Sequence, residues 1–148
     1  ALALLEEETR AVRGWAEIVF AALAEGRSGP GHVAAEHLQA GTVPPAVAES
    51  AAPVAELAAR RKRALMFYET LETLLAETVA CRERAEAWRP RAAAAADLVR
   101  RAAATMDTAP LLAGIARIEQ AKHEIDGNLN IGLVTAVMLQ DLSDPVRT

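Results

Sequence analysis

The stretch PVAELAARRKRALMFYETLETLLAETVACRERAEA, residues 53–87, determines the fold that we expect. After Pro53 it contains no glycine or proline, and its apolar side chains recur at steps of three and four residues. This spacing predicts one amphipathic helix. Its apolar stripe consists of Val54, Leu57, Ala64, Leu65, Tyr68, Leu71, Leu75 and Val79. At about 1.5 Å per residue such a helix is about 50 Å long, so we expect it to brace other elements.

A second helical pattern precedes this stretch, because apolar residues recur at helical spacing between Leu2 and Glu25. Gly14 lies in the middle of the pattern, and glycine is a poor helix former, so we expect two pieces, the first ending near Thr9. Three shorter elements follow: a glycine-rich loop at 26–31, a helical patch at 33–38 and a second break at 41–45.

On the other side of the stretch, Pro90 is expected to stop the long helix, and residues 91–105, rich in alanine, predict the next one. Asp107 or Thr108 is a suitable cap for a further helix. Pro110 fits the first turn of that helix, where its missing N–H is not needed.

The C-terminal part of the sequence predicts the end of one helix and the start of a final one. Gly127 suits a helix C-terminus, and Asn130 suits the N-cap of a helix from Ile131 to about Leu142. That last helix is apolar on nearly every side, so we expect it to be covered on several sides. The chain is therefore predicted to be all-α, a single bundle of about five to six helices with one long helix.

Composition supports this fold class and excludes several functions. Of the 148 residues 35 are alanine, 52% are apolar and the net charge is −4, which excludes a disordered tail. The acidic balance argues against a freestanding nucleic-acid binder. One cysteine, Cys81, and the lack of a signal sequence or a long apolar run favour a reduced, cytoplasmic setting. The first residue, Ala1, suggests a fragment of a longer protein.

Residues that could carry chemistry are few and scattered. His32, His37 and His123 do not share a helical face at a spacing suited to zinc, and Cys81 has no histidine near it in sequence. The loop at 26–31 lacks the Gly-Lys-Ser/Thr ending of a phosphate-binding loop. We therefore expect no catalytic residue, no metal site and no cofactor in this chain.

The run Arg60, Arg61, Lys62 and Arg63 is a candidate for contact with nucleic-acid phosphates. Four consecutive helical residues point in different directions, about 100° apart, so at most two of them share a face. A solvated or salt-bridging surface is the simpler interpretation. Trp15 and Trp88 are interpreted as packing anchors.

The segment IARIEQAKHEIDGNLNIGLVTAVMLQDL, residues 115–142, resembles the end of the collar domain in bacterial DNA polymerase III clamp-loader subunits. Those proteins have an Ile-Glu and a basic residue in one helix, an Asn-hydrophobic-Asn turn, and a leucine-rich last helix. Here the turn is Asn128-Leu129-Asn130, and the leucine-rich run starts at Leu133. The delta-prime subunit is the more similar member, because ALALL at the start of the chain resembles the chain just after that family's ATPase-like modules.

The resemblance implies that residues 1–148 form a single helical collar domain, the third domain of its parent, with the ATPase-like domains upstream. Collar domains join clamp-loader subunits into a ring, so the implied partners are gamma/tau and delta. The implied motif and interface residues are Asn128, Asn130, Leu133 and Val137. The chain itself would hydrolyse no ATP. The alternatives are the collar of gamma/tau, an unrelated helical bundle with a small-molecule pocket, and an adaptor that touches nucleic acid through Arg60–Arg63.

Overall fold

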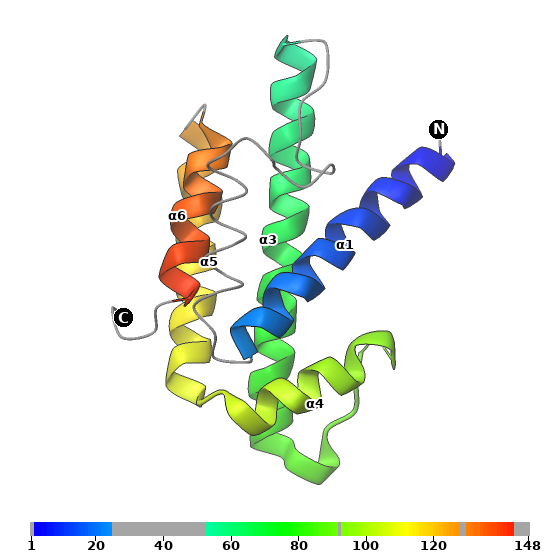
Figure 1. Cartoon of the computed structure of the whole chain (residues 1–148), viewed down its shortest axis with the longest axis vertical. Coiled ribbons are helices and arrows are strands. Elements are labelled where there is room, and N and C mark those ends of the chain that lie inside the picture. The colour runs from blue at the N-terminus through cyan, green and yellow to red at the C-terminus, as the bar shows by residue number, and fades with distance from the viewer. Residues whose placement is uncertain (1, 25–52, 92, 128–129, 144–148) are drawn as a thin grey trace.

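The computed structural model describes residues 2–24, 53–91, 93–127 and 130–143. This part of the chain is all-α, as predicted, and contains five α-helices (Figure 1). The helices are α1 (Leu2–Ala24), α3 (Pro53–Arg84), α4 (Ala96–Thr105), α5 (Thr108–Gly127) and α6 (Ile131–Ser143), with short 3-10 turns at Ala85–Ala87 and Ala93–Ala95. Within these ranges, no helix is both long and apolar enough to cross a membrane.

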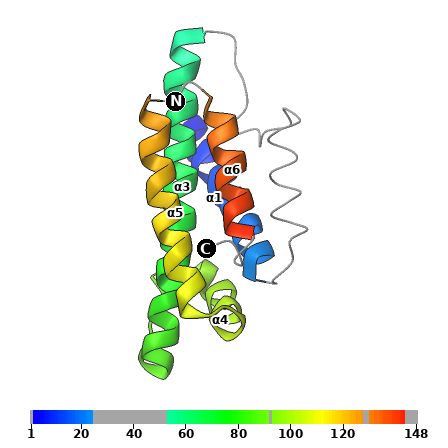
Figure 2. The same ribbon diagram turned by 90° about the vertical axis from the view of Figure 1, so that its left-hand side faces the viewer.

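The long helix α3 is the centre of the bundle. Its 32 residues span about 48 Å, which confirms the predicted brace. It packs against α1, α4, α5 and α6. Figures 1 and 2 show α5 running antiparallel beside it with α6 alongside, while α1 crosses it obliquely and α4 lies near its C-terminal end. Every other described helix therefore depends on α3 for its position.

The buried face of α3 is wider than the single stripe predicted from the sequence. Ala64, Tyr68, Leu71 and Leu75 are buried as expected, with Tyr68 and Leu71 fully inaccessible. Four residues outside the stripe are buried as well: Arg63, Phe67, Leu74 and Thr78. The reason is that helices lie on several sides of α3, so residues flanking the expected stripe also lose their contact with solvent.

The predicted interruption at Gly14 is wrong, because α1 continues through it as one helix. Core contacts on both sides of the glycine explain the continuity: Val12 and Ala16 are buried before and after it. The energy of burying these apolar groups outweighs the cost of about 1 kcal/mol for one glycine in a helix.

Two predicted boundaries of the neighbouring helices are also wrong. The long helix ends at Arg84, before Pro90, because Ala85 adopts a left-handed conformation with φ of 48°. The helix expected from residue 91 begins only at Ala96 after a 3-10 turn, and its N-cap position is Ala95, which has no side-chain group to cap the helix. The alanine run is a good helix former but contains no start signal.

The predicted ends of α5 and α6 are confirmed. α5 starts at Thr108, has Pro110 in its first turn and ends at Gly127. α6 starts at Ile131, directly after Asn130. The loop at 26–31, the helical patch at 33–38 and the break at 41–45 lie outside the described residues.

Candidate interaction surface

The start of α6 is fixed by Asn130, one of the predicted motif residues. The backbone N–H of Leu133 donates to Asn130 Oδ1 at 3.1 Å, and the N–H of Val134 donates to the Asn130 carbonyl at 3.2 Å. The first bond satisfies an N–H group that has no partner inside the helix, and the second is the first regular bond of the helix. Asn128, the other asparagine of the motif, lies outside the described residues.

Two large apolar residues of α6 point to solvent. Leu133 is 50% exposed and Val137 is 38% exposed. They lie four residues apart, so they are neighbours on one face of the helix. Of the other large apolar side chains of this helix, Leu142 is half-buried and four are buried in the bundle: Ile131, Val134, Met138 and Leu139. The expected cover of α6 is therefore incomplete in the described part, and its uncovered face carries both apolar residues predicted for an interface.

The opposite face of α6 is joined to α3 by a buried pair of hydroxyl groups. Thr135 Oγ1 donates to the Ile131 carbonyl at 2.9 Å, which leaves the Tyr68 hydroxyl to donate to Thr135 Oγ1. Burial raises the pKa of Tyr68 to about 12 because the phenolate would be poorly solvated, while the bond to Thr135 opposes the shift. This contact fixes the rotation of α6 and therefore which of its residues face outward.

A further polar contact that the sequence analysis missed connects α5 to α6. Arg117 donates from Nε to Asp141 Oδ2 at 2.7 Å and from Nη1 to Glu124 Oε1 at 3.0 Å. Its side chain is only 12% exposed. Charged hydrogen bonds of this kind are stronger than neutral ones, especially away from water. The signal in sequence is weak, since Arg117 and Asp141 lie 24 residues apart.

Lys122 links α5 to α3 in a similar way. Its Nζ lies 3.0 Å from Glu72 Oε1 and 3.2 Å from Glu119 Oε1. Burial raises the pKa of Glu72, and its hydrogen bond with Glu119 raises it further. Hydrogen bonds with Glu72 and then with Lys122 lower the pKa of Glu119. Desolvation lowers the pKa of Lys122, but the hydrogen bonds and charges of the two carboxylates have the larger combined effect and raise it.

The basic run on α3 makes contacts inside the molecule. Arg61 Nε donates to the carbonyl of Ile125 near the C-terminal end of α5 at 3.2 Å. Arg63 is buried and lies 3.7 Å from Glu8 of α1. Arg60 is half-buried, and Lys62 is exposed. The four residues thus have separate environments, as their helical spacing predicts; whether they contact phosphate stays a prediction.

The remaining candidates for chemistry do not form a site in the described ranges. No group of three histidine, cysteine, aspartate or glutamate residues placed there could hold a metal ion. His123 is exposed and Cys81 is half-buried, while His32 and His37 lie outside the described residues. Trp88 is buried and donates from Nε1 to Glu77 Oε2 at 2.9 Å, which fits a packing anchor.

Because known proteins offer no match, any functional proposal for this chain rests on its own residues. No protein-family model, curated protein or solved structure matches the chain.

Proposed function

We propose that this chain is an oligomerisation domain of a bacterial DNA polymerase III clamp loader, similar to the collar of the delta-prime subunit. Its role would be to hold subunits together in the cytoplasm while sliding clamps are loaded for DNA replication, without enzymatic activity of its own. Its expected partners are gamma/tau and delta. Within the same family, the gamma/tau collar is the alternative identity.

The observation that carries this proposal is the exposed apolar pair Leu133 and Val137. The two residues follow the Asn130 cap in the segment that resembles the collar, and they were expected at a subunit interface from the sequence. A leucine that is 50% exposed beside a valine that is 38% exposed leaves apolar surface on a well-anchored helix. Apolar side chains on a rigid element are suitable centres for a protein interface.

The arrangement around this pair supports the same role. The hydroxyl pair of Tyr68 and Thr135 and the ion pair of Arg117 with Asp141 hold α6 from two sides. Because these contacts are made within the chain, α6 needs little ordering when it meets a partner. A surface that is ordered in advance binds with a smaller entropic cost.

The test is a binding experiment between this chain and purified gamma/tau and delta subunits. We expect capture by at least one of them, and at least tenfold weaker binding after the double substitution Leu133→Glu and Val137→Glu. The matched control is Ile18→Glu, which changes another exposed apolar residue, 62% exposed, on a different helix, α1. The control variant is expected to bind normally.

The outcomes separate the family from the surface. If the unmodified chain binds neither gamma/tau nor delta, the clamp-loader proposal is wrong. If it binds, and the double variant binds equally well while remaining folded, the family stands and the interface lies elsewhere.

A further inference from the structure

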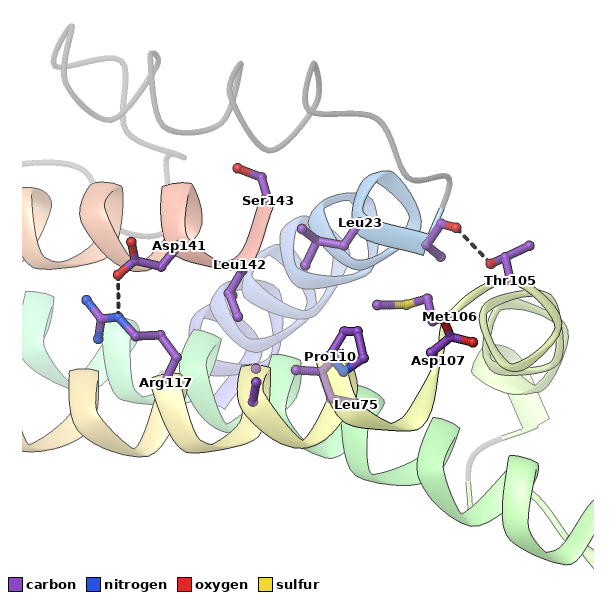
Figure 3. Close-up of a pocket in the computed structure, with 13 residues that line it drawn as sticks. Leu23, Leu75, Thr105, Met106, Asp107, Pro110, Arg117, Asp141, Leu142 and Ser143 are labelled. Carbon is purple, nitrogen blue, oxygen red and sulfur yellow. Dashed lines mark hydrogen bonds and ion pairs between the residues drawn. The ribbon is translucent and has the colours of Figure 1, made fainter. Parts of the chain in front are cut away.

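A cavity of about 230 Å³ lies where four helix ends meet, and the proposed assembly role does not use it. It is bounded by the C-terminal ends of α1, α4 and α6, by the first turns of α5 and by the middle of α3 (Figure 3). Its apolar walls are Leu23, Leu75, Met106, Pro110 and Leu142. Gly114 also lines it, and its lack of a side chain lets Leu75 and Leu142 approach closely, since a Cβ there would lie 3.2 Å from a carbon of each.

The hydroxyl groups in the lining have already given their protons to main-chain carbonyls. Thr105 Oγ1 donates to the Ala24 carbonyl at 2.8 Å, and Ser143 Oγ donates to the Gln140 carbonyl at 2.9 Å. Each hydroxyl oxygen still has lone pairs to offer. Both groups are therefore available to a ligand as hydrogen-bond acceptors.

The charged groups in the lining are mainly acceptors too. Asp141 accepts from Arg117, and Arg117 is held between Asp141 and Glu124, so two carboxylates balance its single charge. Asp107 is exposed at the start of α5, and among the described residues its carboxylate makes no ion pair or hydrogen bond. The dipole of α5 favours an anion at this position, and Asp107 already supplies one.

From this distribution we propose that the cavity binds a compact apolar molecule with a cationic amine, the amine facing Asp107. An engineered apolar cavity of about 150 Å³ accommodates benzene, so 230 Å³ suits one or two fused rings. The apolar walls would hold the rings, while the acceptors would take the protons of the amine. An anionic ligand would face the same hydrogen-bond acceptors but would have no proton to donate to them.

The experiment uses three probes that share one ring system and differ in one group: naphthylmethylamine, naphthylmethanol and naphthoate. Each is titrated into the full chain, and its dissociation constant is measured by NMR from the shifts of the lining residues. We expect saturable binding, with the amine about threefold tighter than the alcohol, because partly exposed charge pairs contribute up to about fivefold. The naphthoate is expected to bind most weakly.

Two substitutions test the carboxylate and the apolar wall of the site separately. Asp107→Asn is expected to remove the preference for the amine and leave binding of the alcohol unchanged. Its control is Asp126→Asn, the loss of another exposed carboxylate near the far end of α5. Gly114→Ala places a methyl group 3.2 Å from side-chain carbons of Leu75 and Leu142, so it is expected to weaken all three probes. Its control is Gly14→Ala, where an added methyl meets nothing within 4 Å.

The outcomes are decisive because Asp107 is exposed and its replacement leaves the core intact. Loss of the amine preference in Asp107→Asn, with Asp126→Asn unchanged, supports the site. Equal binding of the amine and the alcohol, tightest binding of naphthoate, or no saturable binding of any probe overturns it. So does an amine preference that survives Asp107→Asn.

Discussion

Tyr68 offers a direct test of the contact between α3 and α6, because it is the only tyrosine in the chain. Its hydroxyl is enclosed between these helices, and burial raises its pKa from 10.0 to about 12. One pKa unit corresponds to about 1.4 kcal/mol between the two protonation states. Ionising the hydroxyl in the folded protein therefore costs about 3 kcal/mol more than ionising it in the unfolded chain.

The sign of the effect on stability follows from the raised pKa. Below pH 10 the tyrosine is neutral in both states, and its contribution is fully present. Between pH 10 and 12 the unfolded chain loses the proton while the folded protein keeps it, so the free energy of unfolding falls by up to about 3 kcal/mol. Tyr68→Phe removes this part of the pH dependence, because phenylalanine has no proton to lose.

The assay follows the ultraviolet absorbance of the tyrosinate during a pH titration, once in buffer and once in concentrated urea. We expect a midpoint near pH 12 for the folded chain and near pH 10 for the unfolded chain. Urea denaturation of the original chain and of Tyr68→Phe at several pH values then measures the change in stability. A folded-state midpoint close to 10, or equal pH dependence in the two proteins, would show that Tyr68 is accessible to water and that α6 is not seated as described.

Three further predictions concern helix interiors and ends, and urea denaturation measures each. Gly14→Ala is expected to stabilise the fold by about 1 kcal/mol, because the added methyl meets no neighbour and alanine favours the helix. Destabilisation would mean that the methyl group clashes with a neighbouring atom. Ala85→Gly is expected to stabilise by about 0.5 kcal/mol, because the left-handed conformation costs alanine more than glycine; a loss near 1 kcal/mol would indicate an ordinary helical φ instead. Asn130→Ala is expected to cost about 1 kcal/mol through loss of the cap on α6, whereas Asn130→Asp keeps an accepting oxygen; equal losses in both variants would contradict the capping role.

The features that the sequence predicts well are local ones. The long helix, the cap at Asn130 and the stop at Gly127 depend on residues close together in the chain, and all three are confirmed. The boundaries at Arg84 and Ala96 were missed because alanine-rich sequence is compatible with a helix on either side of them.

The features that the sequence misses depend on distant partners. The pairing of Tyr68 with Thr135 and of Arg117 with Asp141 joins residues 67 and 24 positions apart, and neither partner indicates the other by type or spacing. The cavity also depends on residues far apart in the chain, since it lies between helix ends whose relative positions are set by packing. Exposure of Leu133 was foreseen only as part of an implied interface; which residues face outward is set by how α6 rests on α3.

The position of α1 has a consequence for the order in which the bundle assembles. Helices α3, α4, α5 and α6 follow one another through short connections, and α3 contacts each of the other three, although its contacts with α5 and α6 skip the helices between them. α1 reaches the same core across residues 25–52, and closing a segment of that length costs about 3 kcal/mol of chain entropy. Docking of α1 is thus one nonlocal step, and Phe20, which is fully buried, supplies part of the apolar contact that offsets its cost. We therefore expect the C-terminal helices to form first and the first helix of the chain to complete the domain last.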